Sequence, residues 1–310
     1  MDYRKIIKFG HNAYVVSMPA KWLKRNKVEK GDTLFLEEVG NQIILSTQKE
    51  SKQEDQVETI DVKEKDTNAT ISRKLISSYE NNATTIIFSS NYVSKKAKMI
   101  SDLVKLFTAL EIIEHTKNRI VCKTYIDTTT IDIVSFIRRM DNGIKSIMKD
   151  LVEQLNKPQE LKQFREDITE REKSIDKITR LLRRVIKERL YKQQQKQESA
   201  LTLLRYWQAI VYIEELGDML EEISCAPIET FSKKETGQAQ CFLQQALELF
   251  EKIMPVFYQQ ESTKAHALAD TIKKIRTEME EKLKKEEHTI ILHKISQCAY
   301  LIHEINKVSY

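Results

Sequence analysis

Hydrophobic and polar positions change their spacing twice along the chain, and the first segment is built of short β-type runs. Residues 1–48 interrupt β-branched and aromatic side chains with glycine turns such as Gly40-Asn41. Pro19 suits the start of a helix. The predicted elements are strands at 3–8, 13–18, Thr33–Val39 and Gln42–Ser46, and a short helix at Ala20–Arg25.

The second segment, residues 57–126, alternates between strand and helix patterns. The polar stretch at 49–56 separates it from the first segment and is typical of a linker. The alternation predicts a small α+β connector domain. Its expected elements are strands at Val57–Val62, Thr84–Ser89 and Arg119–Ile126, and helices at Ala69–Tyr79 and Lys95–Glu114.

The third segment, 128–310, follows a helical spacing throughout. Pro158, Pro227 and Pro255 mark expected breaks, and Gln193–Gln197 is a polar joint. Apolar residues at steps of three and four predict helices packed in a bundle. The predicted helices cover about 129–156, 159–192, 198–224, 231–259, 262–285 and 287–307.

These six helices form a weak internal repeat. Leu204 aligns with Leu292, and Tyr212 then aligns with Tyr300. Three helices per repeat cannot each bury an apolar face alone, so the repeat predicts two three-helix bundles side by side. Repeat 1 covers about 129–224 and repeat 2 about 231–307.

Charge is concentrated at the N-terminus. The 310 residues carry a net charge of +5, but residues 1–30 alone carry eight basic and two acidic side chains. Such a local excess favours a polyanion-binding surface, although a solvated surface that keeps the protein soluble explains it as well. The basic residues there are Arg4, Lys5, Lys8, Lys21, Lys24, Arg25, Lys27 and Lys30.

The first segment is too small to bury a core by itself. Interlacing with a second copy would cover the strand edges that one copy leaves open. We therefore expect a homodimer through residues 1–48.

The sequence also indicates the cellular compartment in which the protein is expected to act. No apolar run approaches the length of a membrane span, and MDYRKIIKFG lacks a signal-peptide core. The cysteines are scattered without a C-x-x-C pair, which predicts reduced, mostly buried thiols in a cytoplasmic protein. They are Cys122, Cys225, Cys241 and Cys298.

Two helices carry acidic pairs at a spacing of four. Glu172 and Asp176 share one predicted helix, and Glu214 and Asp218 share the next. Such pairs stand on one helix face, and two antiparallel helices could bring all four carboxylates together. Oxygen ligands suit Mg²⁺, Mn²⁺ or iron. Acidic pairs are also common on solvated helix faces, so spacing alone leaves both interpretations open.

Enzyme chemistry is not indicated. A carboxylate-bridged di-iron enzyme would use Glu-x-x-His on its bundle helices, and no histidine has glutamate three residues before it. Phosphate-binding loops and the G-x-S-x-G nucleophile motif are also missing from the sequence. We expect a protein that is not an enzyme and has no catalytic residue.

The first segment resembles the AbrB/SpoVT family of swapped-hairpin DNA-binding domains. The resemblance lies in the basic first strand, the motif at Ser17–Trp22 and the turn at Lys30–Asp32. It implies a dimeric barrel in which two chains interlace their hairpins and basic side chains face DNA. The residues expected to bind DNA are Arg4, Lys5, Lys8, Lys21, Lys24 and Arg25.

The helical segment resembles PhoU, the phosphate-uptake regulator built from two three-helix bundles. Its metal-binding E(D)-x-x-x-D motifs match Glu172–Asp176 and Glu214–Asp218. In the second repeat the corresponding positions are His266, Asp270, Ile302 and Asn306. The resemblance therefore implies one site for a divalent metal or iron per chain, at Glu172, Asp176, Glu214 and Asp218.

Together the segments predict a dimeric, cytoplasmic, DNA-binding transcriptional regulator of phosphate uptake with a metal-binding sensor or relay domain. The alternative is a PhoU-type adaptor that acts on a phosphate transporter or signalling protein by protein contacts. In that case the barrel would serve only for dimerisation.

Overall fold

The computed structural model describes residues 3–11, 13–39, 42–47, 56–156, 160–192, 199–285 and 290–309. The chain divides into two compact units, residues 1–54 and 55–310. Several predicted features lie outside the described residues: the Gly40-Asn41 turn, Pro158, the joint at Gln193–Gln197, and all of the 49–56 linker except Gln56.

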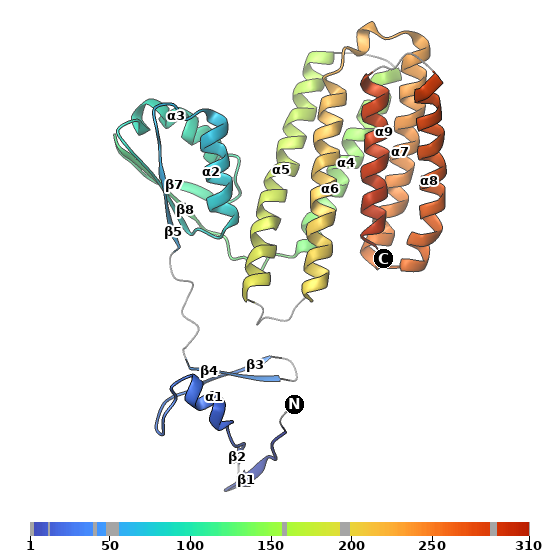
Figure 1. The fold of residues 1–310 in the computed structure, drawn as a ribbon. Coiled ribbons are helices and arrows are strands. Elements are labelled where there is room, and N and C mark those ends of the chain that lie inside the picture. The colour runs from blue at the N-terminus through green and yellow to red at the C-terminus, as the bar shows by residue number, and fades with distance from the viewer. Residues whose placement is uncertain are drawn as a thin grey trace. The chain divides into compact units, whose positions relative to one another are not determined.

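The described residues of the first unit form two antiparallel hairpins and one short helix, as the sequence predicts (Figure 1). Gly10 stands in the first turn with a φ of +71°, a left-handed conformation that glycine adopts without steric cost. The strands are shorter than predicted at several ends. The elements are β1 (Ile7–Phe9), β2 (Ala13–Val15), α1 (Ala20–Arg25), β3 (Phe35–Val39) and β4 (Gln42–Ser46).

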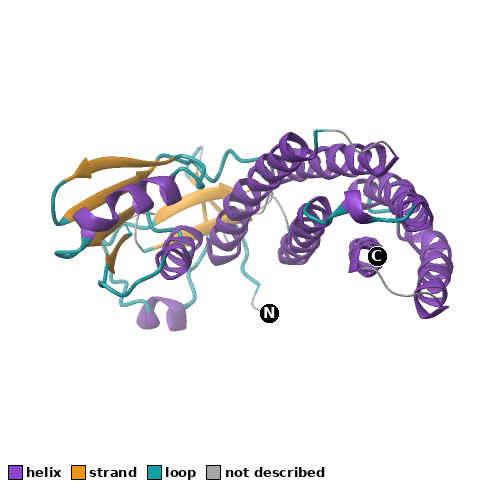
Figure 2. Ribbon diagram, turned by 90° about the horizontal axis from the view of Figure 1, so that it is seen from above, coloured by secondary structure: helices purple, strands orange, loops and turns teal. Residues whose placement is uncertain are grey.

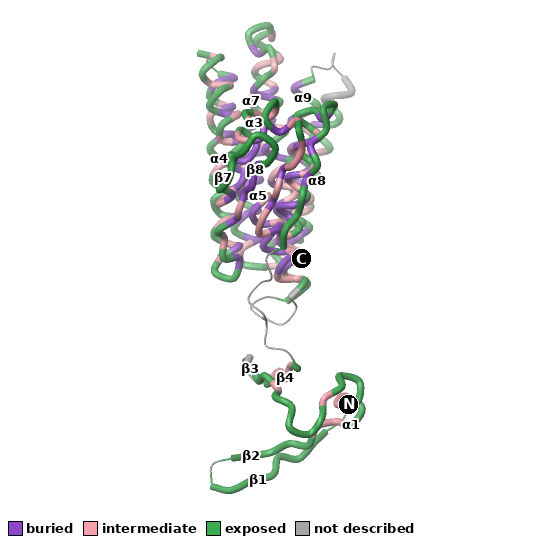
Figure 3. Tube along the Cα trace, turned by 90° about the vertical axis from the view of Figure 1, so that its left-hand side faces the viewer, coloured by how far each residue is buried: buried purple, intermediate pink, exposed green. Residues whose placement is uncertain are grey.

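This unit has no core of its own among its described residues. None of the side chains described between residues 3 and 47 is buried (Figure 3). Tyr3, Ile6 and Phe9 are each at least 70% exposed. So many exposed apolar side chains in one place are typical of an interaction surface.

The connector at the start of the second unit is a four-stranded sheet with two helices packed on it. Strand order is β5-β6-β8-β7, with β5 and β6 parallel and the other pairs antiparallel. Ile86 and Phe88 of β6 pack in its core with Ile71 and Leu75 of α2. The elements are β5 (Val57–Asp61), α2 (Asn68–Glu80), β6 (Thr85–Ser89), α3 (Val93–Val104), β7 (Leu110–His115) and β8 (Arg119–Thr124).

One connector prediction is wrong. The sequence predicts a helix over Lys95–Glu114, but α3 ends at Val104 and Leu110–His115 forms the edge strand β7. Ala109 takes a φ of +53°, which a continuing helix does not allow. The β-branched residues Ile112 and Ile113 favour a strand. Ile112 lies opposite Cys122 of β8, and Ile113 falls at a register irregularity between Ile112 and Glu114.

The described residues after the connector form six long helices, whose ends lie within four residues of the predicted limits. Helices α4, α5 and α6 pack together, as do α7, α8 and α9, and the two groups join through α4 with α7 and α6 with α9 (Figure 1). Figure 2 shows the helices from above. One continuous apolar core runs through both groups. The helices are α4 (Ile133–Asn156), α5 (Leu161–Lys192), α6 (Ala200–Ser224), α7 (Lys233–Gln259), α8 (Ser262–Lys285) and α9 (Ile290–Lys307).

The predicted breaks have different outcomes. Pro227 precedes the short 3₁₀ turn η1 (Ile228–Thr230), which separates α6 from α7. Pro255 does not end the helix: it lies inside α7, near the C-terminal end of that helix. Where α7 begins, Ser232 and Glu235 form a reciprocal capping box.

Two further sequence expectations can be compared with the described residues. Cys122 and Cys298 are buried, but Cys225 and Cys241 are exposed, so only half of the thiols are buried as expected. Among the described residues, no helix combines the length and apolar character needed to cross a membrane.

Candidate metal centre and basic surface

Helices α5 and α6 bring three of the four predicted metal ligands together. Glu172 and Asp176 lie one turn apart on α5, and Asp218 lies on α6. One carboxylate oxygen of each lies within 4.8 Å of the other two. Like charges at this separation repel unless a cation or a proton compensates them. The donor set therefore fits a hard or borderline cation.

The helical spacing explains why a carboxylate is buried here. Glu172 follows Ile168 by four residues and precedes Ile175 by three, so it falls on the apolar stripe that α5 turns toward the core. Its residue exposure is only 7%. Burial raises the pKa of Glu172, and the neighbouring charges of Asp176 and Asp218 raise it further. A bound cation would compensate both the burial of the ionised Glu172 carboxylate and its repulsion by Asp176 and Asp218.

Asp218 is exposed at the rim of the group, yet its pKa is also raised. Partial burial is the main cause, and repulsion from Asp176 adds to it. The three carboxylates thus span a gradient from buried Glu172 through half-buried Asp176 to exposed Asp218. Such an arrangement leaves one side of the group open to solvent.

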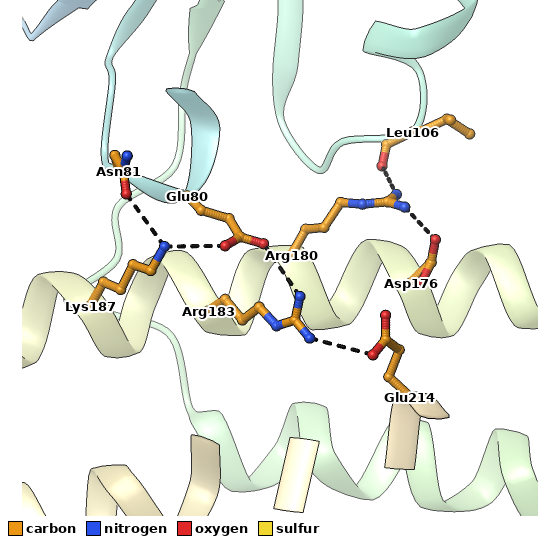
Figure 4. Close-up of polar contacts among 8 residues, drawn as sticks. All are labelled: Glu80, Asn81, Leu106, Asp176, Arg180, Arg183, Lys187 and Glu214. Atoms are coloured by element: carbon orange, nitrogen blue, oxygen red, sulfur yellow. Dashed lines mark hydrogen bonds and ion pairs between the residues drawn. The ribbon is translucent and has the colours of Figure 1, made fainter. Parts of the chain in front are cut away.

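The fourth predicted ligand, Glu214, is not one of the three residues whose carboxylate oxygens lie within 4.8 Å of one another. Its carboxylate pairs with Arg183 at 3.4 Å. Burial raises the pKa of Glu214 to about 7, although the positive charge of Arg183 opposes the rise. Asp176 also has a basic partner, since it accepts a hydrogen bond from Arg180 (Figure 4). Two of the four predicted ligands are therefore paired with arginines of α5.

The second repeat does not reproduce the cluster within the described residues, where the three carboxylates of α5 and α6 are the one such group. His266 and Asp270 are exposed on α8. Ile302 and Asn306 are buried in α9, and the Asn306 side-chain amide donates to the Ala265 carbonyl at 2.9 Å. Ile302 and Asn306 thus have structural roles in this repeat, whereas His266 and Asp270 lie on its surface.

The predicted DNA-binding residues all lie in the first unit and are all exposed. Lys8 is on β1, and three others are on α1. None of the six is buried by its own chain, so a polyanion could reach them. The residues are Arg4 and Lys5 before β1, Lys8, and Lys21, Lys24 and Arg25 of α1.

Sequence reasoning missed a basic row on α5. Arg180, Arg183, Arg184 and Lys187 follow steps of three, one and three, which places them on one helix face. This face meets the connector, since α2 packs against α5. The spacing was readable in the sequence, but the connector partners of these basic residues lie 74 to 107 residues earlier in the chain.

Comparison with protein-family models gives two matches. Residues 7–53 match the model described as "Antidote-toxin recognition MazE, bacterial antitoxin". Residues 137–226, which cover most of α4 and all of α5 and α6, match the PhoU domain. Comparisons with curated proteins and with solved structures give no match.

The chain thus combines an N-terminal domain of the MazE/AbrB type with a PhoU domain, which confirms the architecture expected from the sequence. The matched PhoU segment contains all four predicted metal ligands. Together the two domains support a regulator of phosphate homeostasis.

Proposed function

We propose that the chain is a dimeric, DNA-binding regulator of phosphate homeostasis whose helical domain binds a divalent metal or iron cation. The observation that carries the proposal is the joint presence of a MazE-type domain and a PhoU domain on one chain. The regulator would act in the cytoplasm, and no residue is assigned a catalytic role.

Dimerisation is supported by the first unit itself. Its exposed apolar side chains and its lack of buried described residues require a partner surface. A second copy is the simplest partner, because pairing would also cover open strand edges. Analytical ultracentrifugation of the full chain at micromolar concentration should give the mass of a dimer, and a monomer would contradict the proposal.

DNA binding is supported by the exposed basic residues of the same unit. If they neutralise phosphates, affinity must fall steeply with salt, because binding releases counterions. Fluorescence anisotropy with DNA from upstream of phosphate-transport genes, over a salt series, measures this slope. Replacing Arg4, Lys5 and Lys8 by Gln should flatten it by up to about three units.

A matched control separates a specific surface from general charge. Lys65, Lys98 and Lys117 are exposed in the connector, so replacing them by Gln removes the same charge. That variant should keep the wild-type slope. If the two triple variants behave alike, the first unit is not the DNA-binding surface.

The metal is supported by the fit of the three carboxylates. Glu172, Asp176 and Asp218 would hold the cation, which would supply positive charge where burial and repulsion disfavour ionised carboxylates. Elemental analysis of protein purified without chelator, together with the thermal shift caused by added Mn²⁺, Mg²⁺, Zn²⁺ or iron, tests this. If no metal is bound and no thermal shift occurs, these three residues are acidic side chains of the helices that bind no metal.

The alternative is an adaptor that acts by protein contacts alone. The family description of the first unit refers to recognition between an antidote and a toxin, and its apolar side chains are exposed. Both features suit a protein partner. A dimer that fails to bind any DNA at low salt would favour this adaptor over the DNA-binding regulator.

A further inference from the structure

The connector is anchored to α5 by one buried arginine. Arg184, which is 1% exposed, donates to the carbonyl oxygens of Tyr79 at 2.8 Å and Ala83 at 3.0 Å. Tyr79 lies in the last turn of α2, where carbonyls lack intrahelical partners and a cation is favoured. The Arg184 guanidinium also lies 5.0 Å from the centre of the Tyr79 ring. These contacts of Arg184 join α5 to the connector and do not involve the three clustered carboxylates.

A second arginine, one turn earlier, belongs to both the connector interface and the carboxylate cluster. Arg180 donates to the carbonyl oxygen of Leu106 at 3.1 Å and pairs with the carboxylate of Asp176 (Figure 4). Its guanidinium lies 5.4 Å from the centre of the Phe107 ring. Leu106 and Phe107 lie between α3 and β7 of the connector. Asp176 therefore helps to fix the group that holds this segment.

A third arginine makes a parallel connection. Arg183 lies between Glu80 of α2, at 3.7 Å, and Glu214 of α6, at 3.4 Å (Figure 4). Lys187 reinforces the connector end of this connection with an ion pair to Glu80 at 3.2 Å. Two ionic paths thus lead from the connector to α5 and α6 near the carboxylates.

We propose that cation binding at Glu172, Asp176 and Asp218 loosens the contact between the connector and α5 through Arg180. Asp176 is the residue that the cation and Arg180 would share. A cation on Asp176 withdraws negative charge from Arg180 and places a like charge beside it. The side chains of Arg180 and Asp176 are only 15% and 22% exposed, so water screens this competition less than at an open surface.

The coupling has a consequence in both directions. If the cation weakens the Arg180 contact, an intact Arg180 contact must weaken cation binding by the same factor. The expected effect is on the segment beside Leu106, which Arg180 holds against α5. This inference rests on the proposed metal site.

The test uses the full chain and Mn²⁺ as the probe. Calorimetry gives the Mn²⁺ affinity, and hydrogen exchange measured by mass spectrometry follows the peptides over 104–110. The key variant is Arg180→Gln. The matched control is Lys177→Gln, which removes the same charge next to Asp176; in the described part of the chain Lys177 makes no hydrogen bond or ion pair to the connector.

In the wild type, saturating Mn²⁺ should raise exchange over 104–110, and the control should respond equally. In Arg180→Gln this response should disappear, and Mn²⁺ affinity should exceed that of the control by about fivefold, at the low end of known couplings. Arg183→Gln, which leaves Arg180 intact, should keep the response and provides a second folded variant. Circular dichroism checks that each variant is folded.

Three results would overturn the inference. Mn²⁺ could bind the wild type without changing exchange over 104–110, or the response could persist in Arg180→Gln, or affinity could rise equally in the control. Each of these leaves the metal site standing. No Mn²⁺ binding at all would remove both the metal site and the coupling, so the two failures are distinguishable.

Discussion

Replacing Asp218 by Asn should stabilise the metal-free protein, although it removes a predicted metal ligand. Asp218 lies with Glu172 and Asp176 in a group whose carboxylate oxygens are within 4.8 Å of one another. At neutral pH the charges that repel are those of Asp218 and Asp176, since Glu172 is protonated there. Two unit charges at that distance repel by about 0.9 kcal/mol in bulk water and by about 3.5 kcal/mol at an effective dielectric of 20. Asp218 is exposed, so the lower figure applies.

We therefore expect Asp218→Asn to raise the free energy of unfolding by about 1 kcal/mol in the presence of a chelator. Added Mn²⁺ should then stabilise the wild type but not the variant, because the variant has lost a ligand. The same substitution thus raises stability without metal and lowers it, relative to the wild type, with metal. An ordinary surface carboxylate would show neither effect.

Urea unfolding followed by fluorescence can measure this in the helical domain. The chain has two tryptophans, Trp22 in the first unit and Trp207 on α6. A Trp22→Phe background leaves Trp207 as the reporter. Glu166→Gln, an exposed position on α5 outside the cluster, is the control and should change stability by less than 0.5 kcal/mol, roughly the usual surface effect. Equal stability of Asp218→Asn and wild type in chelator, at low salt, would refute the argument from repulsion.

Three more predictions concern stability. Burial and repulsion raise the pKa of Glu172 from 4.5 to about 8, so the metal-free protein should lose stability as pH rises through that interval, and saturating Mn²⁺ should reduce the loss in pH-dependent unfolding. Arg165 donates a hydrogen bond to the Ala226 carbonyl oxygen at 2.9 Å, just after the end of α6. Arg165→Ala should therefore lower the free energy of unfolding, measured by urea unfolding, by about 1–2 kcal/mol. Ser232→Ala removes the capping box with Glu235 and should cost about 1 kcal/mol, measured by urea unfolding.

The helices of the second unit were predictable because their signals are local. Apolar residues at steps of three and four, together with polar joints, set the limits of α4 to α9 within a few residues. The edge strand β7 was not predicted, because Leu103 and Leu110 fit a helical spacing while the decisive feature, pairing with β8, is a tertiary contact.

In the candidate site, too, local features were predictable from the sequence and tertiary contacts were not. The four-residue spacing predicted that Glu172 and Asp176 share one helix face, and in the structure a carboxylate oxygen of each lies within 4.8 Å of one of Asp218. It could not show that Glu214 pairs with Arg183, because that contact depends on how α5 and α6 pack and on which side-chain rotamers result. The exposed apolar surface of the first unit was anticipated from its size, because so short a segment buries little apolar surface by itself.

The strengths of the arginine contacts limit how far the connector can move. Arg184 makes two hydrogen bonds from a fully buried guanidinium, each worth about 1.5–3 kcal/mol because the donor is charged. The Arg180 pair with Asp176 is partly exposed and is worth about 1 kcal/mol. A cation that competes only for Asp176 therefore cannot release the connector from α5. It can only free the segment beside Leu106, so the exchange response to Mn²⁺ should be confined to residues 104–110 and should spare α2.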